Sequence, residues 1–226
     1  MQMNDIMDEL LDKCMNVQSE QNVSKSRFNK CKWSFIIGRN VNAIGARNFT
    51  KPHNIFAHKG VYLGDVNNSK KPEWQIEIYN IAEKLLMIVD ESYIGEHKDY
   101  CLMVSEMVGN DSSVGAENND YMFEHVDGQD IMYQYGFTLG NYEGGNLVCK
   151  TQDEKPIEMD SRRRIIRFDP RLPHKVGNLV CGRRFAFLYY KTYDRNIRGK
   201  AEPILACPQY MIQKSVFENA DSTSGI

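Results

Sequence analysis

Several features that mark common protein classes are missing from this 226-residue sequence. No apolar stretch approaches the roughly 20 residues that a membrane-spanning helix needs, so we expect no membrane association. The first segment, MQMNDIMDELLDKC, is acidic and lacks the positively charged start and apolar run of a secretory signal. Both absences favour an intracellular protein, nuclear or cytoplasmic.

The cysteines lack the spacing of a metal-binding or redox motif, because none of them forms a C-x-x-C pair. The sequence has six cysteines: Cys14, Cys31, Cys101, Cys149, Cys181 and Cys207. Such scattered residues argue for free thiols in a reducing compartment, and against a disulfide framework or a structural zinc site.

Charge is distributed unevenly, although the formal net charge is only −2. Between Ser161 and Lys200 there are twelve Lys and Arg residues and two acidic residues. This segregation suggests a basic surface suited to phosphate. The alternative is a set of solvated strand faces whose acidic partners lie elsewhere in the fold.

The first hundred residues contain two segments with helical periodicity. Residues 3–16 and 72–90 each place apolar side chains three or four positions apart, and Pro72 suits a first helical turn. The apolar positions are Ile6, Leu10, Leu11 and Cys14 in the first segment, and Trp74, Ile78, Ile81, Leu85 and Val89 in the second. We expect each helix to bury one face.

The remaining pattern is that of short strands. The expected strands are 33–39, 58–65, 100–108, 121–126, 131–139, 146–150, 163–168, 176–180 and 184–192. Helices that precede a run of short strands predict a mainly β protein of the α+β class. We expect a double-stranded β-helix, or jelly-roll, with the N-terminal helices packed on one sheet.

One pair of residues suggests a metal site. His125 and Asp127 are two apart, so in a strand their side chains share a face and can reach one ion. The H-x-D pattern also occurs at His97 and Asp99, which shows how easily it arises. We favour His125 because it follows a strand-like segment, whereas His97 lies in a charged loop after the second helix.

Two later residues complete the pattern. His174 lies 49 residues after His125, and Arg184 follows ten residues later. Two imidazoles and one carboxylate can occupy one face of an octahedral Fe(II) and leave three positions open. The planar fork of an Arg can hold a carboxylate in two places. Together these residues predict an Fe(II)/2-oxoglutarate oxygenase site.

Strand alternation distinguishes Arg184 from its neighbour Arg183. Arg184 should share a face with Ala186, Leu188 and Tyr190, whereas Arg183 sides with Phe185, Phe187 and Tyr189. A small residue two positions after Arg184 leaves room for a dicarboxylate. We therefore predict that Arg184 holds the co-substrate and that Arg183 lies at the surface, an assignment that a β-bulge would swap.

The stretch HVDGQD…FTLGNYEGGNLV…FDPRLPHKV…GRRFAFLYY resembles the TET/J-binding-protein family of Fe(II)/2-oxoglutarate dioxygenases, which oxidise the 5-methyl group of pyrimidines in DNA. The resemblance covers roughly residues 100–193. It implies that His125, Asp127 and His174 bind iron, that Arg184 binds 2-oxoglutarate and that O2 is the oxidant. We expect one domain over 1–226, with a supporting part (1–99), a catalytic core (100–193) and a C-terminal extension (194–226).

The resemblance also suggests substrate contacts. Asp130 lies where some family members place a polar residue that binds the flipped base, and Asn42 is a second candidate. A carboxylate can accept from the exocyclic amine of cytosine, which favours 5-methylcytosine over thymine. Asp130 could instead stabilise a turn. A hydroxylase of a protein side chain or small molecule, and a non-catalytic binding relative, stay open as alternatives to a DNA oxygenase.

Overall fold

The computed structural model describes residues 2–17, 31–38, 73–94, 100–109, 122–127, 130, 132–151 and 155–191. Its helices are α1 (Met3–Met15) and α3 (Glu73–Ile94). Its strands are β1 (Cys31–Gly38), β2 (Cys101–Val108), β3 (Met122–His125), β4 (Gln134–Leu139), β5 (Tyr142–Gly144), β6 (Leu147–Lys150), β7 (Pro156–Met159), β8 (Ile166–Phe168), β9 (His174–Val176) and β10 (Leu179–Tyr190).

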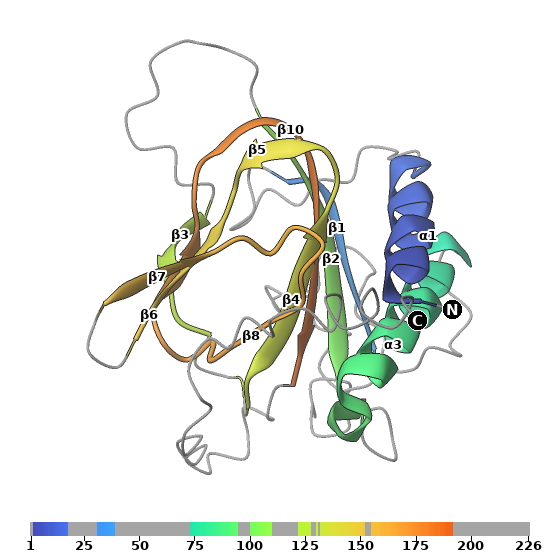
Figure 1. The fold of residues 1–226 in the computed structure, drawn as a ribbon, viewed down its shortest axis with the longest axis horizontal. Coiled ribbons are helices and arrows are strands. Elements are labelled where there is room, and N and C mark those ends of the chain that lie inside the picture. The colour runs from blue at the N-terminus through green and yellow to red at the C-terminus, as the bar shows by residue number, and fades with distance from the viewer. Residues whose placement is uncertain are drawn as a thin grey trace, which may run out of the picture.

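The strands form two antiparallel sheets that face each other (Figure 1). Sheet 1 has the order β1-β2-β10-β4-β8, and β5 pairs with β10 off this path. Sheet 2 has the order β3-β9-β6-β7. Figure 1 shows α1 and α3 on the side of sheet 1 that faces away from sheet 2. The mainly β architecture and the helical layer on one sheet are therefore as the sequence predicts.

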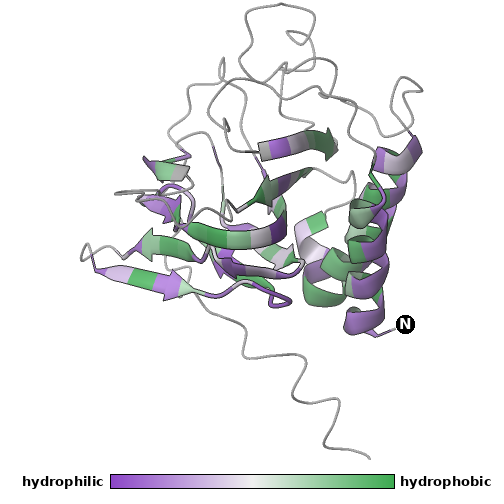
Figure 2. Ribbon diagram, turned by 90° about the horizontal axis from the view of Figure 1, so that it is seen from above, coloured by the Kyte–Doolittle hydropathy of each residue, from purple (hydrophilic) through white to green (hydrophobic). Residues whose placement is uncertain are grey.

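Both helices form where the periodicity places them, and each buries its apolar face. Ile6 and Leu10 of α1 are buried, as are Ile78 and Leu85 of α3. Figure 2 shows the hydrophobic positions of the helix pair mainly on the side toward the sheets. The helical backbone of α3 breaks at Asp90 (φ −159°, ψ 85°), the residue at which the expected helix ends, and one further turn follows.

Two apolar clusters hold the layers together. The larger cluster lies between the helices and sheet 1 and includes Phe185, Phe187 and Tyr189 of β10. The smaller cluster lies between the sheets and includes Leu147 of β6 and Phe168 of β8. Adjacent residues of β10 thus serve different cores, because alternate side chains of a strand point to opposite faces.

The expected strands at 176–180 and 184–192 need correction. β9 ends at Val176, and β10 runs from Leu179 to Tyr190 without a break. Gly182, which falls in the gap between the two expected strands, lies inside β10 with φ 83°, and a Cβ there would be 2.1 Å from the carbonyl oxygen of Asn141. The glycine permits this close approach instead of ending the strand.

Two short strands were not expected from the sequence, and one expected strand cannot be compared. β5 lies inside the segment NYEGGN, whose glycines suggest a turn, and β7 begins at Pro156, directly after the charged residues 153–155. The expected strand at 58–65 lies outside the described residues, as does the C-terminal extension at 194–226. Neither α1 nor α3 is long and apolar enough to cross a bilayer.

Candidate metal centre

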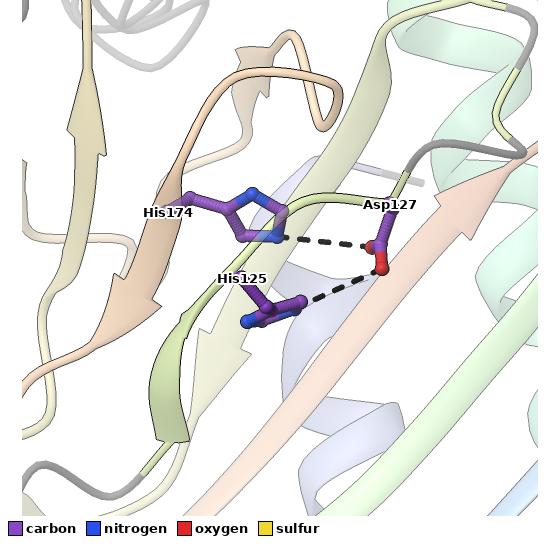
Figure 3. Close-up of side chains that lie close together, drawn as sticks. All are labelled: His125, Asp127 and His174. Carbon is purple, nitrogen blue, oxygen red and sulfur yellow. Dashed lines mark ion pairs between the residues drawn. The ribbon is translucent and has the colours of Figure 1, made fainter.

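Sheet 2 brings the three predicted metal ligands together. His125 is the last residue of β3, His174 is the first of β9, and the two are directly opposite in the antiparallel ladder. Asp127 follows β3 two residues later. One ligand atom from each of the three residues lies within 4.8 Å of the others, and Figure 3 shows the two rings on one side of the carboxylate.

The separations between these ligand atoms suit a shared ion. Nε2 of His125 is 3.8 Å from Oδ1 of Asp127, and Nε2 of His174 is 3.7 Å from Oδ2 (Figure 3). Both separations are too long for direct hydrogen bonds. Ligand atoms bound about 2.0–2.2 Å from one divalent ion are at most about 4.4 Å apart. The carboxylate oxygens therefore fall within the distance that a common ion allows.

Hydrogen bonds fix which nitrogen of each ring can bind a metal. Nδ1 of His125 is 2.8 Å from the carbonyl oxygen of Phe123, and Nδ1 of His174 is 2.9 Å from that of Leu172. A carbonyl oxygen can only accept, so each Nδ1 carries the proton and each Nε2 keeps its lone pair. These are the nitrogens that face Asp127. Two imidazole nitrogens and a carboxylate are a donor set that a divalent transition metal binds.

Burial supports the form of His174 that binds metals. The residue is 5% exposed, and Phe168 packs edge-on against its ring at 5.4 Å between centroids. Removal from water disfavours the imidazolium and lowers the pKa of His174 below its ordinary value. A neutral ring is the ligand form.

Asp127 is held by its neighbours and not by the strand ladder. Its backbone N–H donates to the carbonyl oxygen of Pro170 at 2.8 Å. Its Oδ2 accepts a hydrogen bond from Nε2 of Gln134 at 3.3 Å. Gln134 was not among the site residues predicted from the sequence, although alternation places it on the opposite face of β4 from Tyr135. The signal in the sequence that could have identified Gln134 was a glutamine at a strand position that faces the protein interior.

Arg184 and Arg183 point in opposite directions, as alternation predicts. Arg184 is 3% exposed, and its Nη1 contacts Sδ of Met107 at 3.2 Å. Gly145, in the G-G turn, lies against it: a Cβ there would be 3.0 Å from Cδ of Arg184. The missing side chain therefore makes room for the buried Arg.

Arg183 lies at the surface only in part, because its side chain is 32% exposed and also has a buried partner. Its Nε donates to Oε1 of Glu106 at 2.6 Å, and Glu106 is completely buried. Its Nη1 contacts Sδ of Met15 at the end of α1 at 3.3 Å. A buried carboxylate requires a partner, and Arg183 supplies it while the outer part of its side chain stays in solvent.

The remaining predicted site residues divide into two groups. Asp130 is 3% exposed, and its Oδ2 accepts a hydrogen bond from Nε2 of Gln134 at 2.5 Å. Burial raises the pKa of Asp130 to about 8, against the lowering effect of that hydrogen bond. Asn42, and the second H-x-D pair at His97 and Asp99, lie outside the described residues.

Several arginines of the basic segment have partners within the fold. Arg163 forms an ion pair with Asp8 of α1 at 2.8 Å, and Arg171 pairs with Asp169 at 2.9 Å. Arg162 donates to the carbonyl oxygen of Tyr142 at 2.8 Å and lies over its ring. These contacts favour the structural explanation of those charges. Phe185 and Phe187 lie in the core and are not available to stack on a base.

One aromatic side chain near the metal ligands is exposed. Phe123 of β3 lies two residues before His125 and is 82% exposed, and Val126, which directly follows His125, is 47% exposed. β3 is one of the two edge strands of sheet 2 among the described residues. A solvent-exposed phenylalanine at an edge next to a candidate site is a candidate substrate contact that the sequence analysis did not single out.

Comparison with known proteins gives distant structural likenesses. No protein-family model matches the sequence, and no curated protein matches it. A 2OG-Fe(II) oxygenase family structure from Burkholderia pseudomallei is 14% identical, with a TM-score of 0.40; the match covers 56% of this chain and 61% of that chain. A full-length Neurospora crassa protein, in complex with alpha-KG and 5-formyluracil, is 13% identical, with a TM-score of 0.48 and coverage of 85% and 71%.

NgTET1 in complex with 5mC DNA is also matched, at 13% identity and a TM-score of 0.36, over 84% of this chain and 67% of that chain. Prolyl hydroxylases are among the other structures. Because the likenesses are distant, the chemistry of this chain has to be argued from its own residues.

Proposed function

We propose that this protein is an Fe(II)/2-oxoglutarate-dependent dioxygenase whose two sheets form a double-stranded β-helix. The observation that carries the proposal is the convergence of His125, Asp127 and His174, with both Nε2 lone pairs and the carboxylate turned toward one point. Two imidazoles and one carboxylate on one side of an ion are the ligand set of non-heme Fe(II) oxygenases.

The residues around the triad have separate tasks in this proposal. His125, Asp127 and His174 would hold the iron, which together with 2-oxoglutarate and O2 supplies the oxidation of a C–H bond. Arg184, buried on the face of β10 that also carries Leu188, would hold the distal carboxylate of 2-oxoglutarate. Burial strengthens such a pair, because the surroundings of low polarity screen the charges weakly.

We further propose that the substrate is the methyl group of a modified pyrimidine in DNA. A base in a duplex is out of reach of a metal centre unless it is extruded, and an extruded base needs a surface on which to stack. Phe123 offers an exposed ring two residues from a metal ligand. Stacking of a base on an aromatic side chain contributes about 1–3 kcal/mol.

The choice of 5-methylcytosine over thymine rests on Asp130. Its Oδ2 accepts from Gln134, so a contact with the exocyclic amine of cytosine would use Oδ1. Thymine carries an acceptor at that position, so it gains no hydrogen bond from the ionised form of Asp130, which predominates above its pKa of about 8. This preference comes from the sequence resemblance, and the burial of Asp130 requires the base to enter the site deeply.

A panel of DNA duplexes and single strands that carry 5-methylcytosine or thymine tests the substrate. The protein is incubated with Fe(II), 2-oxoglutarate and O2, and the nucleosides are then analysed by mass spectrometry. We expect oxidised 5-methylcytosine, formed in proportion to succinate, and no product with His174→Ala. Oxidation of thymine alone would overturn the cytosine preference, and succinate formation without any oxidised nucleoside would overturn the DNA substrate.

A hydroxylase of a protein side chain is the second candidate, favoured by the exposed edge of sheet 2. β3 pairs on one side with β9 and has no described strand on its other side. A peptide could add to such an edge through backbone hydrogen bonds next to His125. Binding to DNA that weakens steeply with salt would support the first candidate against this one.

A further inference from the structure

Gln134 links the two sheets at the metal centre. It lies on β4 of sheet 1, is 1% exposed, and its Nε2 donates to Oδ2 of Asp127 and to Oδ2 of Asp130. The two hydrogens of the amide are thus used on two carboxylates. Asp127 itself belongs to the chain that leaves β3 of sheet 2, so the bond crosses the sandwich.

The orientation of this amide is dictated by chemistry. The carboxylate of Asp127, as a metal ligand, can only accept a hydrogen bond, so the NH2 side of Gln134 faces it, and the same nitrogen lies 2.5 Å from Oδ2 of Asp130. The other side carries a cost, because Oε1 is buried and accepts no hydrogen bond from the residues that the structure describes. The two hydrogen bonds that Gln134 donates explain why this polar side chain is kept in the interior at such a cost.

The cross-strand partner of Gln134 also contacts the metal centre. Gln134 is directly opposite Phe168 in the β4–β8 ladder, and paired residues point to the same face. Phe168 packs against the ring of His174 at 5.4 Å between centroids. This one pair of sheet 1 therefore contacts two of the three predicted ligands, Asp127 by a hydrogen bond and His174 by an aromatic contact.

We propose that Gln134, anchored by Asp130, is a positioning residue that fixes the carboxylate of Asp127 for metal binding. Asp127 lies beyond the last residue of β3 and its side chain is 30% exposed, so the ladder alone does not orient it. The shorter of the two bonds, 2.5 Å to Asp130, holds the amide, and the longer, 3.3 Å, reaches the ligand. The inference rests on the proposed metal site and gives Asp130 a role that needs no substrate.

Titration of the metal-free chain with Co(II), followed by the visible absorption of the bound ion, tests this role without turnover. Loss of a residue that supports a metal ligand typically weakens binding about 10–100-fold, and we expect this for Gln134→Met. Gln134→Glu, which keeps the shape but places a third carboxyl group in the cluster, should weaken binding in the same way. Asp130→Ala should also weaken it, since the amide loses its anchor.

Gln75→Met is the matched control. Gln75 is a second glutamine that is largely buried, at 6% exposed, and its Oε1 likewise lacks a partner among the described residues, but it lies on α3. Co(II) affinity of Gln75→Met should stay within about twofold of the parent value, well below the loss expected for a supporting residue. Far-UV circular dichroism establishes that each variant is folded, and Gln134→Glu carries the test if Gln134→Met is not.

The outcomes separate this inference from the function on which it rests. If Co(II) does not bind the parent chain, or binds His174→Ala equally well, the metal site and the inference both fail. If His174→Ala abolishes binding while the folded Gln134 variants match Gln75→Met, only the inference fails. If the Gln134 variants bind weakly and Asp130→Ala binds normally, Asp130 is not the anchor.

Discussion

His125 and His174 face each other as a cross-strand pair, and each donates its Nδ1–H to the carbonyl oxygen two residues before it in the chain. The acceptors belong to Phe123 and Leu172. Each short segment therefore sets the tautomer of its own histidine, and the ladder between β3 and β9 needs only to bring the two Nε2 atoms together. The site is therefore built from a local hydrogen bond at each histidine and from the long-range pairing of two strands.

Removal of a metal ligand should abolish activity while the fold persists. His125→Ala, Asp127→Ala and His174→Ala should each reduce succinate formation by more than the roughly 100-fold upper range for a supporting residue. Succinate is measured by mass spectrometry, and circular dichroism reports the fold. Turnover that survives in all three variants would rule out this metal centre.

Arg184→Lys should raise the Michaelis constant for 2-oxoglutarate by about tenfold or more, because a point charge replaces a planar fork that grips a carboxylate in two places. The matched control is Arg183→Lys, on the opposite face of the strand, which should leave that constant unchanged. Initial rates at varied 2-oxoglutarate give both values. Equal increases in the two variants would contradict the roles assigned to the two faces.

Arg183→Met should instead lower the free energy of unfolding, by an amount on the order of 1–3 kcal/mol. The substitution leaves the buried carboxylate of Glu106 without its closest cation, and Lys32 at 3.9 Å is the other one nearby. Urea unfolding followed by fluorescence measures the change. The double variant Arg183→Met/Glu106→Gln should recover part of the loss, since the charge that needed a partner is gone.

Periodicity predicts the parts of this fold that depend on which face is buried. The apolar positions of α1 and α3 lie in the core, and the opposite directions of Arg183 and Arg184 follow from alternation in β10. The metal triad was predicted because few residue types bind Fe(II), which makes two histidines and a carboxylate informative even at long separation.

The parts that sequence did not predict depend on contacts between distant segments. Gly182 reads as a turn, yet the approach of Asn141 keeps it inside a continuous strand. Arg183 reads as a surface charge because its partner Glu106 lies 77 residues earlier. The pairing of Gln134 with Asp127 is likewise visible only when the two sheets face each other. No local sequence pattern identifies partners that are so far apart in the chain.

Asp90 should make stability depend on pH in acid. Burial alone would raise the pKa of Asp90, but hydrogen bonds from Ser92, Tyr135 and Tyr133 and from the backbone N–H of Tyr93 outweigh it and lower the pKa. A carboxyl group whose pKa is lower in the folded state stabilises the fold above its unfolded pKa, near 3.8, and loses this contribution as the pH falls through the folded value.

Asp90→Asn tests this effect. The variant should be less stable than the parent at pH 7, and the difference should shrink steadily below about pH 4. Chemical unfolding at a series of pH values measures it. Asp12, on α1, provides a matched control through Asp12→Asn, whose difference from the parent should be much smaller at pH 7. A constant difference between Asp90→Asn and the parent across the acid range would contradict the argument.

Phe123→Ala tests whether the exposed ring is a platform for the substrate. If a flipped or neighbouring base stacks on it, the substitution should weaken DNA binding by about 1–3 kcal/mol, or roughly 5- to 150-fold. Uncoupled consumption of 2-oxoglutarate should persist, because the carbonyl oxygen of Phe123 that fixes His125 belongs to the backbone and is retained.

Val180→Ala serves as the control, because it removes from β10 an apolar side chain that is also exposed, at 47%. Fluorescence anisotropy with labelled DNA gives both affinities. Equal affinity for Phe123→Ala and the parent would leave this ring without a role in base binding, and a peptide at the β3 edge would then be the better explanation of its exposure.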